Sequence, residues 1–454
     1  MQPDLAGFRG QLEKIVGAEH VGVGPTATVK FSVDGVVPGL VVRPGTQDEV
    51  SKALAACADA NAAVVPWGGG TVMGLGNRPR RADVAMTLDR LDRIVEFDAA
   101  NLCVTVEAGV KLAALEATLA EKKEILPLDP PADAKVTAGG LVAANLSGPF
   151  RLLYGTARDW VLGMRVALPD GERVHCGGKV IKNVSGYDMN KLFIGSLGTL
   201  GIIAEVTFKL LPLPATRAGV VGLFPDLAQA TGVVRKTLES VLLPEALELL
   251  DPEAVTLLAP RLGLEAPAGA YGLAVALAGS RDTVERQVRD FSSLFRDAGG
   301  RVTPLPDGRT VLAWDAIRNV FGFLPVPPSA RVLCKIAVPI SRTGELFAAA
   351  CALGRRHGLH AAVTAHAGSG IVWACYLLGP KAPPEEVLAD ALEGLRREAE
   401  HAEGSLVVQD APGSLKARVD AWGKARDGFD VMKRLKAEFD PRGVCNPGRF
   451  LGGL

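Results

Sequence analysis

The sequence predicts an α+β protein of two or three domains, and three observations lead to this prediction. The chain has 454 residues, which is more than one ordinary hydrophobic core organises. Hydrophobic residues make up 48% of it, enough for sizeable cores, while 52 glycines and 30 prolines indicate many turns and short connections. The glycines are densest before residue 214, and beyond it strand-like runs alternate with charged helices. The predicted domains cover 1–216 and 217–405, and a C-terminal segment covers 406–454.

The first part of the chain, over 39–110, alternates strand with helix. A buried strand over 39–44 ends at a proline, and an amphipathic helix over 46–61 follows, with Thr46 as its N-cap. A second strand over 62–67 runs straight into GGGTVMGLG. Further along, the pattern predicts a strand over 83–88, a hairpin over 94–110 and a helix over 111–123.

A second glycine-dense block covers 137–202. It contains a strand over 160–174 that turns at Asp170 and Gly171. Pro212 and Pro214 close the block and mark a domain boundary.

The remainder of the chain predicts an α+β domain with an antiparallel sheet, followed by one more helix over 428–439. No internal repeat is evident at periods of 20–50 residues. The predicted strands cover 219–224, 271–279, 331–341 and 371–379, and the predicted helices cover 283–299 and 383–404.

Charge and hydropathy exclude several classes of protein. Fifty acidic and fifty basic residues cancel, so the composition does not favour nucleic acid as a partner. Residues 1–17 have no apolar run long enough for a signal peptide. The most apolar stretch, 197–215, contains Glu205 and Lys209 and is expected to be a strand, so we expect no transmembrane segment.

The seven cysteines are scattered, odd in number and never spaced C-x-x-C. This pattern disfavours disulfides, a zinc site and an iron–sulfur cluster. It favours a reduced, cytoplasmic protein.

The glycine loop after the second strand is the first candidate site. Glycines let the backbone approach a ligand where a Cβ would collide, and the loop presents several N–H groups to an anion such as a pyrophosphate. The loop matches neither G-x-G-x-x-G opening a helix nor G-x-x-x-x-G-K-[ST], so neither a Rossmann site nor a P-loop is indicated. The alternative is a glycine-rich turn without a ligand, which the second glycine block and a third near the C-terminus make less attractive.

Four segments together resemble a known family: PWGGGT with GLG, TAGGLVAANLSGP, KVIKNVSGYDMNKLFIGSLGTLGIIAEVTFKLLP, and FDPRGVCNPGRF. In this order they resemble the vanillyl-alcohol-oxidase or PCMH-type FAD-binding oxidoreductases, closest to the group of the glycolate oxidase FAD-binding subunit and the D-lactate and 2-hydroxyglutarate dehydrogenases. The resemblance is specific over 39–214 and 439–450. It implies a two-part FAD-binding domain, an α+β cap with a ferredoxin-like antiparallel sheet, and a C-terminal segment that returns to the FAD domain.

The resemblance also implies which residues bind FAD. The first loop wraps the pyrophosphate, the middle segments line the flavin and adenosine, and the terminal N-P-G-[KR] reaches the flavin from the other side. The implied residues are Trp67, Gly68, Gly69, Gly70, Thr71, Gly74, Gly76, Pro130, Thr137, Gly139, Gly140, Asn145, Ser147, Gly148, Lys182, Asn183, Ser185, Gly186, Tyr187, Asp188, Gly198, Ile203 and Asn446. For Tyr187 the alternative is an ordinary core aromatic.

The mode of FAD attachment follows from the same comparison. Some members of the family attach FAD through a His directly after the G-G of the first loop, or through a Cys in a later one. Gly70 and Thr71 stand at the first of these places, and 145–148 contains no Cys. We therefore predict non-covalent FAD.

The candidate catalytic residues lie in the predicted cap. Hydroxy-acid dehydrogenases of the family bind a divalent metal through H-x-G-D-G-N-x-H in the cap. Here His366 matches, but Ser369, Ile371 and Trp373 replace the Asp, the Asn and the second His. A single His seldom holds a metal alone, so we predict no metal site. His366 is either a hydrogen-bonded loop histidine near the flavin or a surviving base.

A second feature of the family is an Arg after W-x-x-x, which clamps the substrate carboxylate. Trp314 and Arg318 have this spacing. The alternative for Arg318 is a solvated side chain on a helix.

Two redox functions remain open, beside a third possibility, a degenerate flavin-binding scaffold with no redox role. In the first, the chain is the FAD-binding subunit of a glycolate-oxidase-like complex and passes electrons between a catalytic flavoprotein subunit and an iron–sulfur subunit. In the second, it oxidises a small 2-hydroxy acid itself, with Arg318 and His366. The missing metal motif favours the first. Partners of this kind imply a cytoplasmic location, at the inner face of a membrane if the partners are held there.

Overall fold

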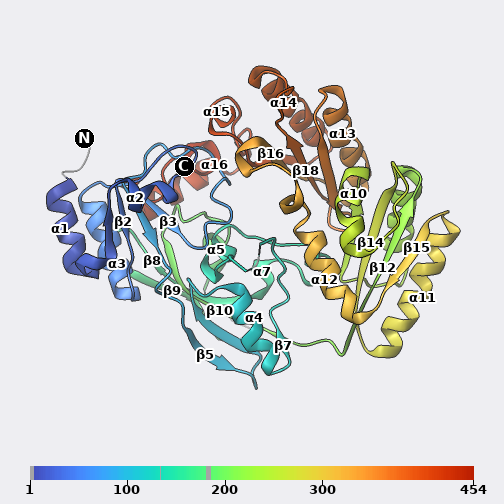
Figure 1. Cartoon of the computed structure of the whole chain (residues 1–454). Helices are drawn as coiled ribbons and strands as arrows, with labels where there is room; N and C mark the ends of the chain where they lie inside the picture. Colours follow the sequence, from blue (N-terminus) through green and yellow to red (C-terminus); the bar gives the residue numbers. More distant parts are fainter. Residues whose placement is uncertain (1–4, 133, 180–185) are drawn as a thin grey trace. The chain divides into compact units, whose positions relative to one another are not determined.

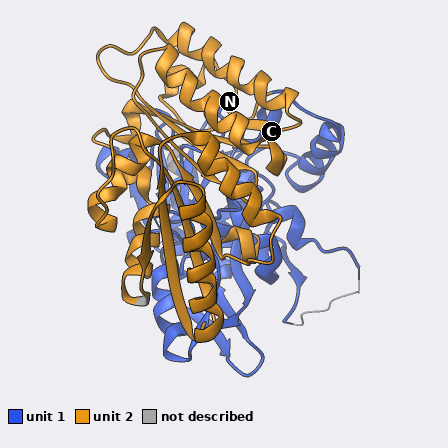
Figure 2. Ribbon diagram, turned by 90° about the vertical axis from the view of Figure 1, so that its right-hand side faces the viewer, with its two compact units in different colours: residues 1–147, 156–213, 424–454 blue, residues 148–155, 214–423 orange. Residues whose placement is uncertain are grey.

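The computed structural model describes residues 5–132, 134–179 and 186–454, which form two compact units. Unit 1 is built from 1–147, 156–213 and 424–454, and unit 2 from 148–155 and 214–423 (Figures 1 and 2). The chain therefore passes into unit 2 twice. Its two segments in unit 2 begin at Gly148 and at Pro214.

The first sheet of unit 1 is the strand–helix alternation that the sequence predicts. Thr46 caps α3 (Gln47–Asp59), because its Oγ1 accepts a hydrogen bond of 3.1 Å from the N–H of Glu49. The helix buries Val50 and Leu54 in the same core as the strands. In spatial order the strands are β1 (Val21–Val23), β2 (Leu40–Val42), β4 (Val84–Thr87) and β3 (Val64–Trp67). β1 pairs with β2 in antiparallel orientation, and the other two pairs of neighbours are parallel.

The second sheet of unit 1 is antiparallel and contains the predicted hairpin and the predicted turn at Asp170. Thr105 and Thr207 face each other on neighbouring strands, with their buried hydroxyls 2.9 Å apart. In spatial order its strands are β5 (Ile94–Asp98), β6 (Cys103–Glu107), β10 (Ile202–Lys209), β8 (Val161–Ala167) and β9 (Arg173–Gly177).

The other elements of unit 1 are short, as the glycine and proline content indicates. Its further helices and its small two-stranded sheet are α1 (Leu5–Val16), α2 (Pro25–Thr28), α4 (Leu112–Glu121), α5 (Ala138–Ala143), α7 (Ala157–Trp160), α8 (Asn190–Phe193), α16 (Phe429–Phe439), β7 (Glu124–Ile125) and β11 (Leu211–Pro212).

Unit 2 is one antiparallel sheet made of two ferredoxin-like halves. The second half follows the order strand, helix, strand, strand, helix, strand, and the first half has the same order with one more helix, α10 (Pro252–Leu262), between its second and third strands. The halves join where β13 pairs with β17. Each half is much longer than a repeat with a period of 20–50 residues, so its duplication is compatible with the absence of such a repeat in the sequence. In spatial order the strands are β15 (Arg301–Leu305), β12 (Thr216–Phe224), β14 (Tyr271–Gly279), β13 (Ala246–Leu250), β17 (Ala361–His366), β18 (Ile371–Leu377), β16 (Arg331–Ala337) and β19 (Ser405–Asp410).

Helices cover the two faces of this sheet unequally. Apolar residues of five helices fill one core, and those of α10 and α12 form a separate core (Figure 1 labels the helices). The helices of unit 2 are α6 (Arg151–Tyr154), α9 (Leu227–Leu238), α10 (Pro252–Leu262), α11 (Arg281–Asp297), α12 (Asp307–Arg318), α13 (Thr343–Arg356), α14 (Glu385–His401) and α15 (Gly413–Lys416).

The units divide the chain at other points than the predicted domains do. Residues 148–155, predicted in the FAD-binding part, lie in unit 2 because the Tyr154 hydroxyl donates to Glu245 Oε1 (2.7 Å) and the Phe150 ring packs on Trp314. Residues 406–423, predicted in the C-terminal segment, lie in unit 2 because β19 pairs with β16.

None of the helices in the described part of the chain is long and apolar enough to cross a membrane. All seven cysteines are buried as free thiols.

The C-terminal segment is held in unit 1 by an ion pair whose carboxylate is buried. Lys436 Nζ lies 2.6 Å from Asp440 Oδ2 and also donates to the carbonyl oxygens of Thr199 and Cys445. The Asp440 carboxylate accepts the N–H groups of Val444 and Cys445. Directly after these contacts, the chain at Cys445 runs alongside β3.

Replacing Asp440 with Ala should destabilise unit 1 by about 3–5 kcal/mol, because the Lys436 ammonium would lose its carboxylate and the buried N–H groups of Val444 and Cys445 would lose their acceptor. Urea unfolding of the purified protein measures this loss. Asp430 pairs with Lys433 on the solvent side of the same helix, so Asp430→Ala is the matched control and should change the midpoint little. Equal effects of the two variants would contradict the assigned role of Asp440.

Candidate functional site

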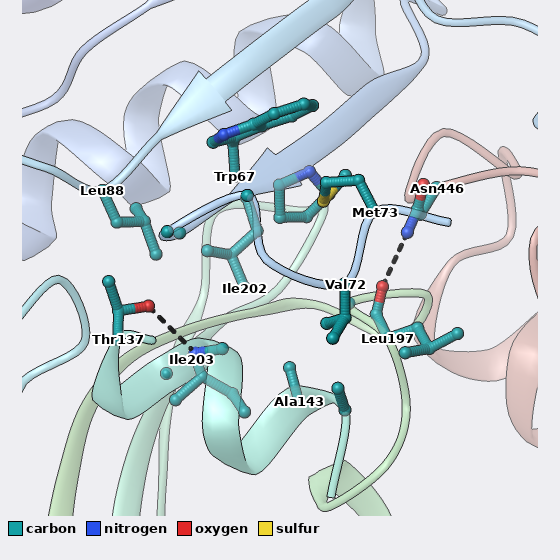
Figure 3. Close-up of a pocket in the computed structure, with 18 of the residues that line it drawn as sticks. Trp67, Val72, Met73, Leu88, Thr137, Ala143, Leu197, Ile202, Ile203 and Asn446 are labelled. Carbon is teal, nitrogen blue, oxygen red and sulfur yellow. Dashed lines mark hydrogen bonds between the residues drawn. The ribbon is translucent and has the colours of Figure 1, made fainter. Parts of the chain in front are cut away.

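A pocket with a cavity volume of about 90 Å³, partly open to solvent, lies within unit 1 (Figure 3). Three stretches of chain line it: the glycine loop after β3, the helix α5, and the turn that leads into β10. Two residues of the C-terminal segment complete it. The lining residues are Pro66, Trp67, Gly68, Gly69, Gly70, Thr71, Val72, Met73, Leu88, Thr137, Gly139, Gly140, Ala143, Ala144, Leu197, Gly198, Gly201, Ile202, Ile203, Asn446 and Arg449.

The glycines of this pocket are required mainly by the protein's own packing. A Cβ at Gly69 would collide with the main-chain carbonyl of Lys135, and one at Gly68 with the Thr137 hydroxyl. This corrects the expectation that the collision would be with the ligand. Gly140 differs, because its Cβ would meet a single atom within 4 Å, Thr137 Oγ1 at 3.1 Å.

The glycine loop presents unused hydrogen-bond donors to the pocket. Among the described residues, the main-chain N–H groups of Gly68, Gly69, Gly70 and Thr71 have no hydrogen-bond acceptor. Neighbouring N–H groups of this kind form a concave site for an anion, because each brings a partial positive charge.

The opposite wall is fixed by α5. The Thr137 hydroxyl caps this helix by accepting from the N–H of Gly140 (3.3 Å), as Figure 3 shows. Val72, Ala143, Ile202 and Ile203 are apolar lining residues. The pocket thus joins an array of N–H donors to an apolar wall, which suits a ligand with both an anionic group and a ring system.

Asn446 contributes a buried acceptor. Its side-chain N–H₂ donates to the carbonyl of Leu197 (2.7 Å; Figure 3). Its Oδ1 is buried and has no partner among the described residues. A buried acceptor of this kind is costly unless a ligand donates to it.

Arg449 was not predicted from the sequence. The guanidinium is buried, donates to the carbonyl oxygens of Met73 (2.8 Å), Leu75 (2.5 Å) and Asn77 (3.3 Å), and lies 3.7 Å from an oxygen of Asp34. Burial lowers the pKa of Arg449 to about 10, which keeps it charged at neutral pH. The signal that could have found it is the basic position of N-P-G-[KR], the same motif that indicated Asn446.

The structure brings about half of the predicted FAD-binding residues together in this pocket. These are Trp67, Gly68, Gly69, Gly70, Thr71, Thr137, Gly139, Gly140, Gly198, Ile203 and Asn446. Lys182, Asn183 and Ser185 lie outside the described residues.

The remaining predicted residues do not line the pocket. Gly76 has a positive φ of 93° and packs against the Arg449 carbonyl, and Gly148 lies in unit 2. Tyr187 is 95% exposed, so it is not a core aromatic either, and the Asp188 carboxylate accepts from the N–H of Asn190. The others are Gly74, Pro130, Asn145, Ser147 and Gly186.

His366 lies at the end of β17 in unit 2, with both ring nitrogens engaged. Trp373 Nε1 donates to His366 Nε2 (3.1 Å), so Nε2 carries no proton. Nδ1 therefore carries the proton and donates to Glu248 Oε1 (2.7 Å). Burial and the positive charges of Arg151 and Lys335 lower the pKa of His366 to about 3, so the ring is neutral at pH 7.

Arg318 is partly buried on α12 and lies 3.0 Å from Asp315 Oδ1, one turn earlier on the same helix. Trp314, the first residue of the predicted W-x-x-x-R pattern, also lies on α12, and its side chain is buried in the core on which this helix packs. Among the described residues, no group of three or more His, Cys, Asp or Glu side chains could hold a metal ion.

The chain was compared with known proteins. A glycolate oxidase subunit, GlcD, of Bacillus subtilis is 28% identical over 97% of this chain and 96% of that protein. The mitochondrial D-lactate dehydrogenase (cytochrome) of Arabidopsis thaliana is 27% identical over 91% of this chain and 74% of that protein.

Among solved structures, p-cresol methylhydroxylase with substrate bound superposes with a TM-score of 0.78 at 18% identity, over 98% of this chain and 96% of that one. This likeness confirms the predicted α+β, PCMH-type fold. Two family models match the sequence: a FAD binding domain over residues 38–177, and the C-terminal domain of FAD linked oxidases over residues 213–450. Since the second model alone spans more than half of the residues, the chain belongs to the family of FAD-linked oxidases.

Proposed function

We propose that this chain is the FAD-binding subunit of a 2-hydroxy-acid dehydrogenase assembly, and that it passes electrons between its flavin and an iron–sulfur partner subunit. The proposal has two parts. The pocket of unit 1 holds the flavin. In unit 2, His366 with its partners Glu248 and Trp373 supplies neither a base nor a metal ligand.

FAD suits the pocket in three respects. Its pyrophosphate matches the unused N–H groups from Gly68 to Thr71, and its ring matches apolar residues such as Val72 and Ile203. A ring N–H or ribityl hydroxyl would satisfy the buried oxygen of Asn446. When bound, FAD can accept two electrons from a donor and release them one at a time.

The observation that carries the electron-transfer role is the state of His366. A base for a 2-hydroxy acid needs a free nitrogen within reach of the substrate hydroxyl. Both ring nitrogens of His366 are instead engaged, by Glu248 and Trp373. Ser369 and Ile371 stand where the resembled motif has its other polar ligands.

The partners follow from the same reasoning. The Bacillus subtilis relative is named as a subunit, and we extend a subunit role to this chain. Electrons that reach this flavin need a further acceptor, and the buried cysteines of the chain never have C-x-x-C spacing. An iron–sulfur subunit supplies that acceptor, and a second flavoprotein subunit supplies the oxidation of the acid.

A second candidate function is direct oxidation of a small 2-hydroxy acid by this chain, and positive charge beside His366 favours it. Lys335 lies on β16 next to Trp373, with its Nζ 5.5 Å from the centre of the indole ring. The charges of Lys335 and Arg151 both act on His366. The two positive charges, on Lys335 and Arg151, would favour binding of a substrate carboxylate near His366.

Substituting Gly140 tests the position of FAD. Gly140→Leu should yield colourless protein, because the side chain would fill the pocket, whereas Gly140→Ala should stay yellow and fold at least as well. Flavin content is measured from the absorbance of the purified proteins, and circular dichroism confirms that both fold. Acid precipitation should release the flavin from the wild-type chain, as non-covalent binding requires. A yellow Gly140→Leu protein would place FAD elsewhere.

Anaerobic reduction separates the two functions. We expect the flavin of the purified chain to stay oxidised with glycolate or D-lactate and to bleach with dithionite, because His366 cannot take the hydroxyl proton. The absorbance near the flavin maximum is followed under both conditions. Rapid bleaching by either acid would establish the second function instead.

The second function carries its own pH signature. Burial and the charge of Arg151 lower the pKa of Lys335 to about 8, so its ammonium is present below pH 8 and lost above it. If Lys335 holds a carboxylate, oxalate affinity should fall by up to about tenfold per pH unit above 8. Lys335→Met should bind weakly at every pH, and Lys335→Arg should keep its affinity to higher pH. Titrations from pH 6.5 to 9.5 measure this, and a flat wild-type profile would remove Lys335 from substrate binding.

A further inference from the structure

The C-terminal segment and the glycine loop form one hydrogen-bonded unit. The N–H of Val64 donates to the carbonyl of Val444 (2.7 Å), and the N–H of Asn446 donates back to the carbonyl of Val64 (2.8 Å). Residue 445 thus pairs in parallel with β3 immediately before the glycine loop. Further on, the N–H of Asn77 donates to the carbonyl of Arg449 (3.0 Å).

Arg449 binds the carbonyl side of that loop. Its guanidinium has five N–H donors in a rigid plane, and they reach the carbonyl oxygens of Met73, Leu75 and Asn77. The loop therefore has its later carbonyl groups bound by Arg449, while its earlier N–H groups, from Gly68 to Thr71, remain available to the pocket.

The charge of Arg449 has the sign that an anionic ligand needs. The guanidinium is 2% exposed and lines the same pocket, and its nearest carboxylate, on Asp34, lies 3.7 Å away. A buried positive charge is costly to keep, and Asp34 and the three carbonyl oxygens offset that cost. A group held this firmly keeps the loop in one shape before the ligand arrives, which lowers the entropy lost on binding.

We infer that Arg449 is a positioning residue for FAD: it holds the glycine loop from its carbonyl side, so that the N–H side is preorganised for the pyrophosphate. This inference rests on the proposed position of the pyrophosphate at Gly68–Thr71. It makes FAD affinity depend on the C-terminal segment, although Arg449 follows the loop by more than 370 residues.

The test compares Arg449→Met and Arg449→Lys with a matched control, Arg442→Met. Arg442 lies on the same C-terminal segment, is half exposed and pairs with Asp59. Apoprotein is titrated with FAD and, in competition, with ADP, which carries the pyrophosphate without the flavin ring. Hydrogen exchange of the peptide that covers the glycine loop is measured on the same apoproteins.

We expect Arg449→Met to weaken FAD and ADP by the same factor, about 10- to 100-fold, and to speed exchange in the glycine loop. Arg449→Lys should lie between it and the wild type, since an ammonium keeps the charge but loses the planar fork. Arg442→Met should match the wild type in all three measurements.

Two results would overturn the inference. In the first, Arg449→Met lowers thermal stability but changes the affinity for FAD and ADP by less than twofold, which would make Arg449 a purely structural residue. In the second, FAD weakens while ADP does not, which would assign Arg449 to the flavin ring. A wrong position for FAD gives a different result, because Gly140→Leu would then remain yellow.

Discussion

The glycine-loop pocket of unit 1 depends on the return of the C-terminal segment to the edge of β3. The segment begins at the Lys436–Asp440 ion pair, pairs with Val64 and ends with Arg449 on the carbonyl groups of the glycine loop. A glycine-rich loop alone has many conformations and loses much entropy when it becomes ordered. The segment contributes the hydrogen bonds that select one of them. The pocket is therefore built from stretches that lie far apart in the sequence, and folding must bring them together to form it.

The glycines contribute to the same result in a different way. Gly68 and Gly69 allow the 135–137 stretch to approach the loop closely, since a Cβ at either position would collide with it. That approach brings α5 and its cap, Thr137, against the loop as the opposite wall of the pocket. The spacing of the glycines thus sets the distance between two walls of the protein, and the ligand occupies the space that they leave.

Local patterns in the sequence predicted most of the fold, and the reasons for the failures are physical. The alternation over 39–110 and the helix cap at Thr46 were found in the structure because they depend on neighbouring residues alone. The duplication in unit 2 was missed, since two halves can share a strand order without sharing side chains. Residues 148–155 lie in unit 2, apart from their neighbours in the sequence, because their place depends on distant partners, such as Glu245 for Tyr154.

Some residues of the candidate site could be predicted from the sequence, and others could not. Motif residues that follow a strand or open a helix, such as Gly68 and Thr137, line the pocket. Arg449 occupies the basic position of N-P-G-[KR], but its contacts with the carbonyl groups of the glycine loop depend on the fold and could not be predicted from that motif. Tyr187 was chosen from its place in a turn, but a turn residue can equally well point into solvent, as this one does.

The Glu248–His366 pair has a structural explanation that is consistent with electron transfer. Glu248 belongs to the first half of unit 2 and His366 to the second, and they face each other where β13 pairs with β17 over three residues. Such a short ladder joins the halves weakly, so a buried hydrogen bond between side chains adds to it. Trp373 extends the connection to β18 through the other ring nitrogen. His366 thus connects β13, β17 and β18 through its two ring nitrogens, a role that needs no metal ion.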